Sequence, residues 1–202
     1  MSASDTQTIR HLQQENIRLK SENNSLRDYV GRLQRAMSAL VDLQEKVDTI
    51  SPQTDIFLLI FEVLNAALVS VGSENGSLLL LDDKTGELVF VEVIGDAREK
   101  LLNYRLPKGV GIAGKAVANG RPVLAANART DPSFSSVVDR YTGLETNSLV
   151  CVPLMDGNRR LGAIEAVNSK TGRPFQQSDL EVMQLVGKLA SLAIVEAEKM
   201  SQ

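Results

Sequence analysis

Apolar residues, most of them leucines, recur every seven positions along the first fifty residues, in two series that lie three residues apart. A repeat of 3.5 residues keeps one seam of a helix facing a second helix, so this pattern predicts a coiled coil over residues 9–50. Residues 1–8 precede the repeat and are expected to form a disordered tail. The predicted dimer seam consists of Leu12, Asn16, Leu19, Asn23, Leu26, Val30, Leu33, Met37 and Leu40.

The two asparagines of the seam indicate how many helices meet and in which direction. Asparagine in such positions is tolerated best in parallel two-stranded coils, where it fixes the register. The flanking charges agree, because Glu15 would face Lys20 of the partner subunit and attract it. A parallel homodimer is therefore expected. Two alternatives are a single amphipathic helix lying on the rest of the protein and a DNA-binding zipper, although the residues before Ile9 contain no lysine or arginine.

The remaining 152 residues change from the heptad pattern to a mixture of helical and strand patterns. Ser51-Pro52 is typical of an N-cap followed by proline at the first helical position, and a wide apolar stripe follows it. A second amphipathic helix is expected over about residues 176–200. Between them, Asn75-Gly76 should end the first helix. Four apolar runs then predict two strand pairs joined by glycine-containing turns: 77–81 with 88–91, and 148–154 with 161–167. This layout indicates an α+β sandwich.

Several segments together resemble a GAF domain over about residues 55–200. They are the runs at 77–82, 107–114, 131–134, 142–143, 149–154 and 161–168. The resemblance implies a six-stranded antiparallel sheet with the terminal helices on one face. It also implies that short helices and loops on the other face close over a small-molecule pocket. We therefore expect a GAF domain over residues 51–202, preceded by the long coiled-coil helix.

A second set resembles the NKFDE signature of the GAF domains that bind cyclic nucleotides. Its members are Asn168, Lys170, Phe175 and Asp179, with Ser169 inserted after the asparagine. From the residue types alone, we expect these side chains to be structural. Lys170 and Asp179 would form an ion pair that fixes the last loop to the final helix, with Phe175 beneath it.

The candidate pocket is argued from helix starts and strand faces. Gly109 to Gly114 match the letters of a dinucleotide fingerprint, but no buried strand precedes them, which argues against a Rossmann fold. Free backbone N–H groups there favour an anion such as a nucleotide, the alternative being plain capping and close packing. Glu165 should face the pocket, because a carboxylate is costly against a helix layer. The candidate pocket residues are Ser77, Gly111, Ile112, Ala113, Asp131, Phe134, Val138, Tyr141, Thr142, Ser148, Val150, Glu165 and Val167.

Composition excludes several chemistries. A single histidine, His11, and a single cysteine, Cys151, leave no basis for a disulfide, a cysteine-rich zinc site, histidine-held haem, bilin attachment or a histidine-dependent nucleophile. Cys151 is expected to be a buried inert thiol. The formal net charge of −3 and the absence of a basic run give no case for nucleic acid. No apolar run is long enough for a membrane helix, and no secretory signal is present, so a cytoplasmic location is expected.

These observations favour a dimeric cytoplasmic sensor or adaptor that is not an enzyme. A ligand in the pocket would shift the coil. Because the sequence ends at Gln202 without an output domain, the signal would pass in trans to another signalling protein. The alternatives are a ligand-free GAF scaffold that serves only in dimerisation and protein docking, and, less favoured, an enzyme. No metal or cofactor is expected, and the ligand is left open.

Overall fold

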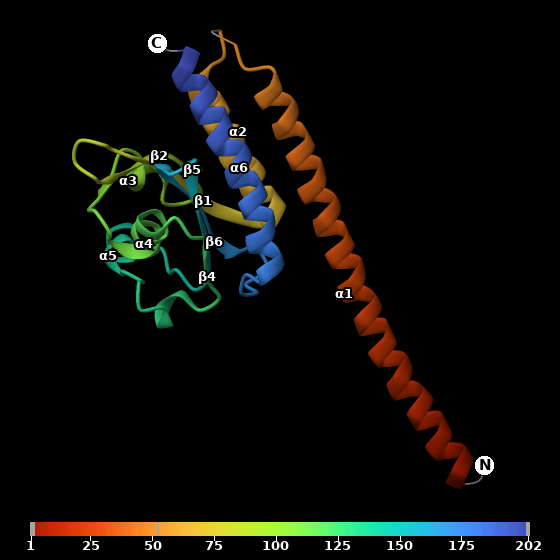
Figure 1. Cartoon of the computed structure of the whole chain (residues 1–202). Coiled ribbons are helices and arrows are strands. Elements are labelled where there is room, and N and C mark those ends of the chain that lie inside the picture. The colour runs from red at the N-terminus through yellow and green to blue at the C-terminus, as the bar shows by residue number, and fades with distance from the viewer. Residues whose placement is uncertain (1–2, 52, 201–202) are drawn as a thin grey trace.

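Six strands form one antiparallel sheet in the spatial order β3-β2-β1-β6-β5-β4. The computed structural model describes residues 3–51 and 53–200 and confirms the expected fold class (Figure 1). In chain order the strands are β1 Ser73–Leu81, β2 Leu88–Ile94, β3 Arg105–Leu106, β4 Val123–Ala125, β5 Leu149–Asp156 and β6 Arg159–Ser169.

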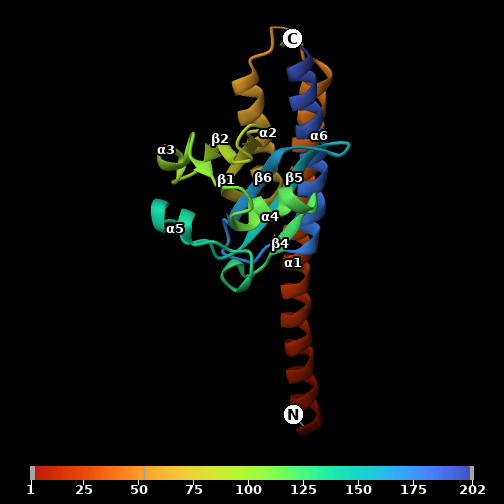
Figure 2. The same ribbon diagram turned by 60° about the vertical axis from the view of Figure 1, so that its left-hand side comes forward.

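Long helices cover one face of the sheet and short segments cover the other (Figure 2). On the first face, α2 (Ile56–Val71) and α6 (Gln177–Met200) pack on each other and on the strands, and α1 (Ala3–Asp48) packs on both helices. None of these described helices combines the length and apolarity that crossing a membrane takes. The second face carries α3 Arg98–Leu101, α4 Gly111–Asn119, a short 3₁₀ helix Ala128–Thr130 and α5 Val137–Thr142.

The three central strands bury side chains on both faces, which explains why they read as continuous apolar runs. Ile164 on β6 pairs with Leu78 on β1 and Val152 on β5, and this row packs against the helices. One position along, the side chains point to the opposite face. That second row, which faces the short helices, is Ser77, Glu165 and Cys151.

The first helix of the sandwich begins later than the sequence suggests. Asp55 is its N-cap, because its carboxylate accepts hydrogen bonds from the N–H groups of Phe57 and Leu58. The expectation that Ser51 caps this helix is wrong: its N–H group bonds the Thr54 hydroxyl in the turn before it. Pro52, the expected first helical residue, lies outside the described residues.

Strand β1 begins earlier than expected. Gly72, with a φ of 67°, ends α2 in the left-handed conformation, and the strand starts at the next residue. Asn75 and Gly76 therefore lie within β1 and do not separate helix from strand. A β-carbon at Gly76 would collide with the Glu165 carbonyl of β6. Glycine at this position therefore allows β1 and β6 to approach each other closely.

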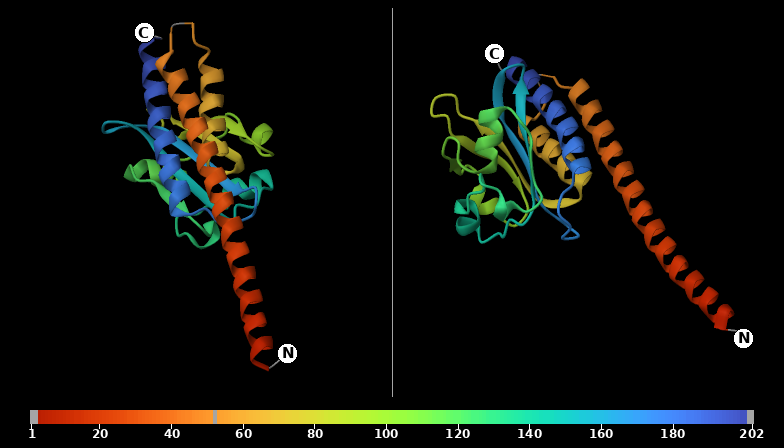
Figure 3. Two further views of the ribbon diagram at one scale, coloured as in Figure 1. Left: turned by 90° about the vertical axis from the view of Figure 1, so that its right-hand side faces the viewer. Right: turned by 60° about the horizontal axis from the view of Figure 1, so that its bottom comes forward.

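Helix α1 presents two apolar faces. Ala36 and Leu43 are buried, and Leu40, Val47 and Ile50 pack against the same core between the helices and the sheet. The heptad pattern assigns Leu40 to the dimer seam, but the structure turns it toward its own domain. The alternative of a helix lying on the rest of the protein thus describes the C-terminal part of α1, as Figure 3 shows.

The N-terminal part of α1 extends away from the sheet (Figure 1). The helix already includes Ala3, so the expected disordered tail over residues 1–8 is wrong from there on, and Met1 and Ser2 lie outside the described residues. The apolar seam residues of this part are exposed, Leu12 at 60%. They are Leu12, Leu19, Leu26, Val30, Leu33 and Met37.

Candidate functional site

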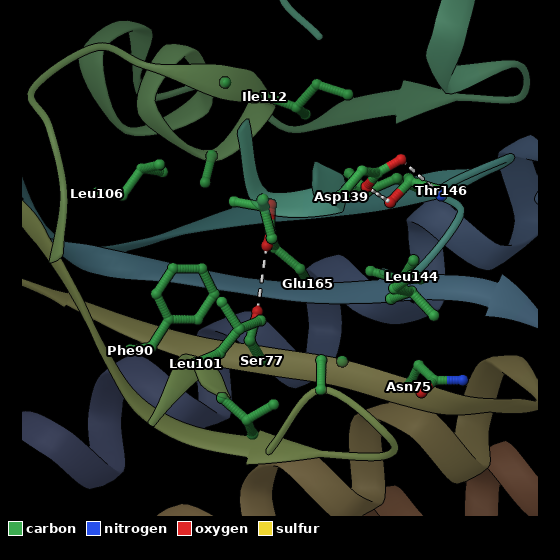
Figure 4. Close-up of a pocket in the computed structure, with 18 of the residues that line it drawn as sticks. Asn75, Ser77, Phe90, Leu101, Leu106, Ile112, Asp139, Leu144, Thr146 and Glu165 are labelled. Carbon is green, nitrogen blue, oxygen red and sulfur yellow. Dashed lines mark hydrogen bonds between the residues drawn. The ribbon is translucent and has the colours of Figure 1, made fainter. Parts of the chain in front are cut away.

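A cavity of about 80 Å³ lies between the sheet and the layer of short helices (Figure 4). Strands β1, β2, β5 and β6 form its floor, and α3, α4 and α5 with their flanking loops form its walls. Eight of the thirteen candidate pocket residues line it: Ser77, Gly111, Ile112, Ala113, Phe134, Val138, Glu165 and Val167.

Glu165 is the central polar group of the floor. It is only 7% exposed, and the Ser77 hydroxyl donates a hydrogen bond to its Oε2 at 3.1 Å. The Cys151 thiol donates a second hydrogen bond to it from β5. Burial raises the pKa of Glu165 to about 7, although these two donors oppose the rise. Near neutral pH the carboxyl group is therefore close to its titration midpoint.

The thiol beneath the cavity is unreactive for a physical reason. Cys151 is fully buried, and both this burial and the neighbouring Glu165 carboxylate raise the pKa of the thiol well above its usual value. Because the thiolate is the nucleophilic form, Cys151 acts here as a hydrogen-bond donor only.

Asp139 is a second acidic residue of the lining, and sequence reasoning missed it. Its Oδ1 accepts a hydrogen bond from the Thr146 hydroxyl at 2.7 Å, and its Oδ2 accepts one from the Thr146 N–H group at 3.0 Å. Arg129 lies 3.5 Å from the same carboxylate. This acid therefore ties α5 to the loop that leads into β5.

The described residues that line the cavity include no lysine, arginine or histidine. Its charged members are Glu165 and Asp139, and its largest side chains are apolar or aromatic, Phe90 and Phe134 among them. Such a lining suits an apolar molecule with a small polar group.

The comparisons with known proteins agree with this architecture. The family model for the GAF domain matches residues 59–195, most of the chain. The chain belongs to the GAF domain family. GAF domains are small-molecule-binding domains of signalling proteins, and the fold is a regulatory one.

Two curated relatives are cyclic-nucleotide phosphodiesterases. The dual 3′,5′-cyclic-AMP and -GMP phosphodiesterase 11A of Takifugu rubripes is 27% identical over 164 residues, which are 76% of this chain and 18% of that protein. The probable 3′,5′-cyclic phosphodiesterase pde-5 of Caenorhabditis elegans is 24% identical over 189 residues, 88% of this chain and 25% of that protein. The chain thus spans a quarter or less of these relatives, and the match runs through their GAF domains.

Solved structures share the fold at low identity. The GAF domain of a phosphoenolpyruvate-protein phosphotransferase from Coxiella burnetii superposes with a TM-score of 0.71 at 16% identity, covering 84% of this chain and 98% of that one. A free methionine-R-sulfoxide reductase from Neisseria meningitidis, in complex with its substrate, gives 0.67 at 20% identity, covering 81% and 90%. These likenesses concern the fold alone.

Three candidate residues around α5 of the GAF domain do not line the cavity. The Asp131 carboxylate accepts the Ser133 N–H group at 2.7 Å and so closes a turn, while α5 begins only at Val137. Tyr141 is half exposed and stacks on Tyr104, with ring centroids 5.1 Å apart. The Thr142 hydroxyl bonds within the helix end, donating to the Val138 carbonyl. Their expected place in the pocket lining is therefore wrong.

Ser148 and Val150 do not face the cavity, so their expected place in the pocket is wrong. Pairing of Cys151 with Glu165 turns the odd-numbered residues of β5 toward the cavity, so Leu149 lines it and its neighbours do not. Val150 packs in the core beneath the helices. The Ser148 hydroxyl accepts the Phe175 N–H group at 2.8 Å.

The NKFDE-like set holds the GAF domain's last loop, but by different contacts from those expected. Asp179 pairs with Arg173 through two hydrogen bonds of 2.8 and 2.9 Å and also accepts the N–H group of Gln176. Lys170 pairs instead with Glu74, 2.9 Å away at the surface. The predicted Lys170–Asp179 ion pair is therefore wrong, because the turn after β6 brings Arg173 to the helix start.

Asn168 and Phe175 complete this framework. The Asn168 side chain, at a left-handed φ of 52°, accepts the N–H groups of Asn147 and Ser148 and donates to the Glu145 carbonyl. Phe175 is fully buried between the sheet and the helices. Neither residue lines the cavity.

Proposed function

We propose that the protein is a dimeric signalling sensor. Its GAF domain binds a small molecule in the cavity over Glu165, and α1 carries the resulting change to a partner signalling protein. The observation that carries this proposal is the cavity itself, with a titratable carboxyl group on its floor and apolar walls around it. We propose no catalytic role, and a cytoplasmic location goes with the sensor role.

The wall formed by α5 is the part that a ligand would order. This helix has six residues and none of them is fully buried, although Val138 and Asp139 line the cavity. A segment with few buried contacts opens at low free-energy cost. Contacts between a ligand and this wall would therefore shift the equilibrium between looser and closed forms.

The same strands touch both the cavity and the helices. Ser77 and Glu165 face the cavity, whereas their neighbours Leu78 and Ile164 pack under α2 and α6. Helix α1 in turn packs on these two helices through Leu43 and the residues around it. A structural change at the cavity floor can therefore reach α1 through side chains that are packed against one another. A ligand and a partner protein can then both shift the equilibrium position of this one helix.

Dimerisation through α1 is the second part of the proposal. The exposed seam from Leu12 to Met37 would face a second copy, with Asn16 and Asn23 setting a parallel register. Ala36 and Leu43, on the other apolar face of the helix, are buried within the protomer. Each α1 would therefore connect the dimer seam to its own GAF domain.

Specific observations also favour the ligand-free scaffold as a second candidate. The cavity of about 80 Å³ is smaller than the roughly 300–1,000 Å³ of drug-sized sites. In the described part of the chain, no buried side-chain nitrogen or oxygen is left without a hydrogen bond. In that case the domain would serve only in dimerisation and docking.

A cyclic nucleotide or another anion is the ligand class with less support. The names of the curated relatives suggest it. However, a phosphate would meet two acids and no cationic side chain among the described lining residues. It would also need a larger space than the cavity offers.

Hydrogen–deuterium exchange separates the sensor from the scaffold. The protein is unfolded, freed of small molecules and refolded, and exchange is then measured with and without the low-molecular-mass extract of the cells that produce it. The sensor predicts slower exchange in α5 and a change in α1 with the extract. Identical exchange in both helices would contradict the sensor and favour the scaffold.

A further inference from the structure

The charged side chains that line the cavity are all of one sign. Within residues 3–51 and 53–200, its lining holds the acids Glu165 and Asp139 and no basic side chain. Much of the remaining surface is hydrocarbon, and it includes the Phe90 ring, which Figure 4 shows on the same side of the sheet as Glu165. Because charges act strongly over short distances where water is scarce, the charged side chains of this lining attract cations and repel anions.

Glu165 keeps hydrogen-bonding capacity for a ligand. An ionised carboxylate accepts about four hydrogen bonds, and two come from Ser77 on β1 and Cys151 on β5. Helix α4 lays Ile112 and Ala113 over the cavity, and these bring no polar side-chain atom. Because Glu165 lines the cavity, a ligand bound there can use the acceptor positions that remain.

The Asp139 carboxylate has less free hydrogen-bonding capacity than Glu165. Figure 4 shows its carboxylate turned toward Thr146, and both of its oxygens accept hydrogen bonds from that residue. Arg129 further neutralises it from outside the cavity. Glu165 is therefore the acid that a ligand would engage.

We propose that the cavity binds a small ammonium ion, namely a primary amine on an apolar body whose nitrogen pairs with the Glu165 carboxylate. This inference rests on the proposed sensor function and names its ligand class. An ammonium group has three N–H donors for the free acceptor positions, and the faces of aromatic rings such as Phe90 in the lining attract cations. The apolar body lies against side chains such as Leu101 and Leu106.

The size of the cavity limits that body. A volume of about 80 Å³ is below the roughly 150 Å³ of an apolar cavity that holds benzene, so a one-ring body fits only if the α5 wall moves outward, and a nucleotide does not fit. Benzylamine, benzyl alcohol and benzoate are matched probes, because they share one ring and differ in whether the polar group is a cation, neutral or an anion. Calorimetry gives their affinities, and the backbone amide signals of Gly111 and Val167 report occupancy of the cavity.

The proposal predicts that benzylamine binds at least about ten-fold more tightly than benzyl alcohol and that benzoate does not bind. Glu165→Gln, which keeps the shape of the side chain, should remove this preference. Glu92→Gln is the matched control: Glu92 is also a buried carboxylate of the sheet, but it does not line the cavity. It should leave the affinity for benzylamine unchanged.

The pH dependence provides a second readout. With the pKa of Glu165 at about 7, raising the pH from 5.5 to 8 should tighten benzylamine binding about thirty-fold, because the ionised fraction grows by that factor. The groups that face Glu165 from its neighbouring strands are the Ser77 hydroxyl and the Cys151 thiol. Ser77→Ala removes a bond that lowers the pKa of Glu165, so it should shift this pH curve upward even if Glu165→Gln fails to fold.

The outcomes separate this ligand class from the sensor function. Equal binding of benzylamine and benzyl alcohol, or binding of benzoate in its place, would overturn the ammonium proposal while leaving the cavity as a ligand site. The ammonium proposal alone also fails if no probe perturbs Gly111 or Val167 but the cell extract slows exchange in α5. If neither the probes nor the extract has any effect, the ammonium proposal and the sensor function both fail.

Discussion

Cys151 and Glu165 are directly opposite each other on β5 and β6, and the Cys151 thiol donates a hydrogen bond to the Glu165 carboxyl group beneath the cavity. The contact couples two buried titratable groups. The carboxylate helps to raise the pKa of the thiol, and the thiol opposes the rise in the pKa of the carboxyl group. Both consequences can be measured.

The thiol should be unreactive in the folded protein. Cys151 is fully buried and its pKa is raised, so the thiolate population is small and inaccessible. A thiol reagent such as dithionitrobenzoate should react with it only after unfolding in denaturant. Fast stoichiometric reaction under native conditions would show that the cavity floor opens and that this burial is wrong.

Folding stability should fall as the pH rises through the range in which Glu165 titrates. The folded protein binds this proton more tightly, with a pKa of about 7 against 4.5 for the free side chain, so the stabilising contribution is fully present below about pH 4.5 and is lost as the pH rises through 7. The loss is on the order of 3 kcal/mol. Urea unfolding at several pH values measures it.

The matched variant isolates this contribution from other groups. Glu165→Gln has no proton to lose, so the difference between wild type and variant should change by that amount between pH 4.5 and about 8. A constant difference across this range would mean that Glu165 titrates normally and is not buried in solution.

Arg173 should matter more for stability than Lys170. Its guanidinium forms two hydrogen bonds with the buried Asp179 carboxylate, whereas Lys170 pairs with Glu74 at the surface. Arg173→Ala leaves that carboxylate without its partner and should cost about 1–3 kcal/mol. Lys170→Ala should cost less than about 0.5 kcal/mol. Chemical denaturation measures the free energy of unfolding of both variants. A larger loss for Lys170→Ala than for Arg173→Ala would favour the Lys170–Asp179 ion pair expected from the sequence.

The dimer seam can be tested with two leucine-sized positions on the same exposed helix. Leu19 belongs to the heptad seam and Ile17 does not, although they are 51% and 69% exposed in the protomer. Leu19→Asp should convert the dimer to a monomer at micromolar concentration, because it places a charge in the seam. Ile17→Asp should leave the dimer intact in sedimentation equilibrium. Equal effects, or a monomeric wild type, would remove α1 as the dimer element.

Docking of α1 on its own domain should depend on the other face of the helix. Leu43 is 2% exposed and Val41 is 56% exposed. Leu43→Ala should destabilise the protein by about 2–4 kcal/mol and increase proteolysis near residues 48–55, whereas Val41→Ala should do neither. Similar behaviour of the two variants would mean that α1 is not packed on α2 and α6 in solution.

Local sequence patterns predict the helices and strands well, but they do not predict contacts between residues that are distant in the sequence. The heptads indicate the long helix, and the cost of burying a carboxylate against helices places Glu165 on the cavity side, where it lies. Nothing local shows that Leu40 is covered by its own domain, since a heptad residue suits either partner.

The errors at the site have the same origin. The sequence places Ser148 and Val150 without the strand register, and the pairing of Cys151 with Glu165 reverses their face. Asp139 escapes sequence reasoning because its role depends on Thr146, which lies beyond the end of its helix. A register argument from Glu165 across to Cys151 is the one available signal that could correct β5.

Native mass spectrometry of wild type and Glu165→Gln, purified in parallel, determines whether the cavity over Glu165 holds a ligand. Both proteins should be dimers, and the wild type should release a stoichiometric small molecule on denaturation, whereas the variant should release little or none. A wild-type dimer that carries nothing, or a variant that releases as much as the wild type, would contradict a ligand site built on Glu165.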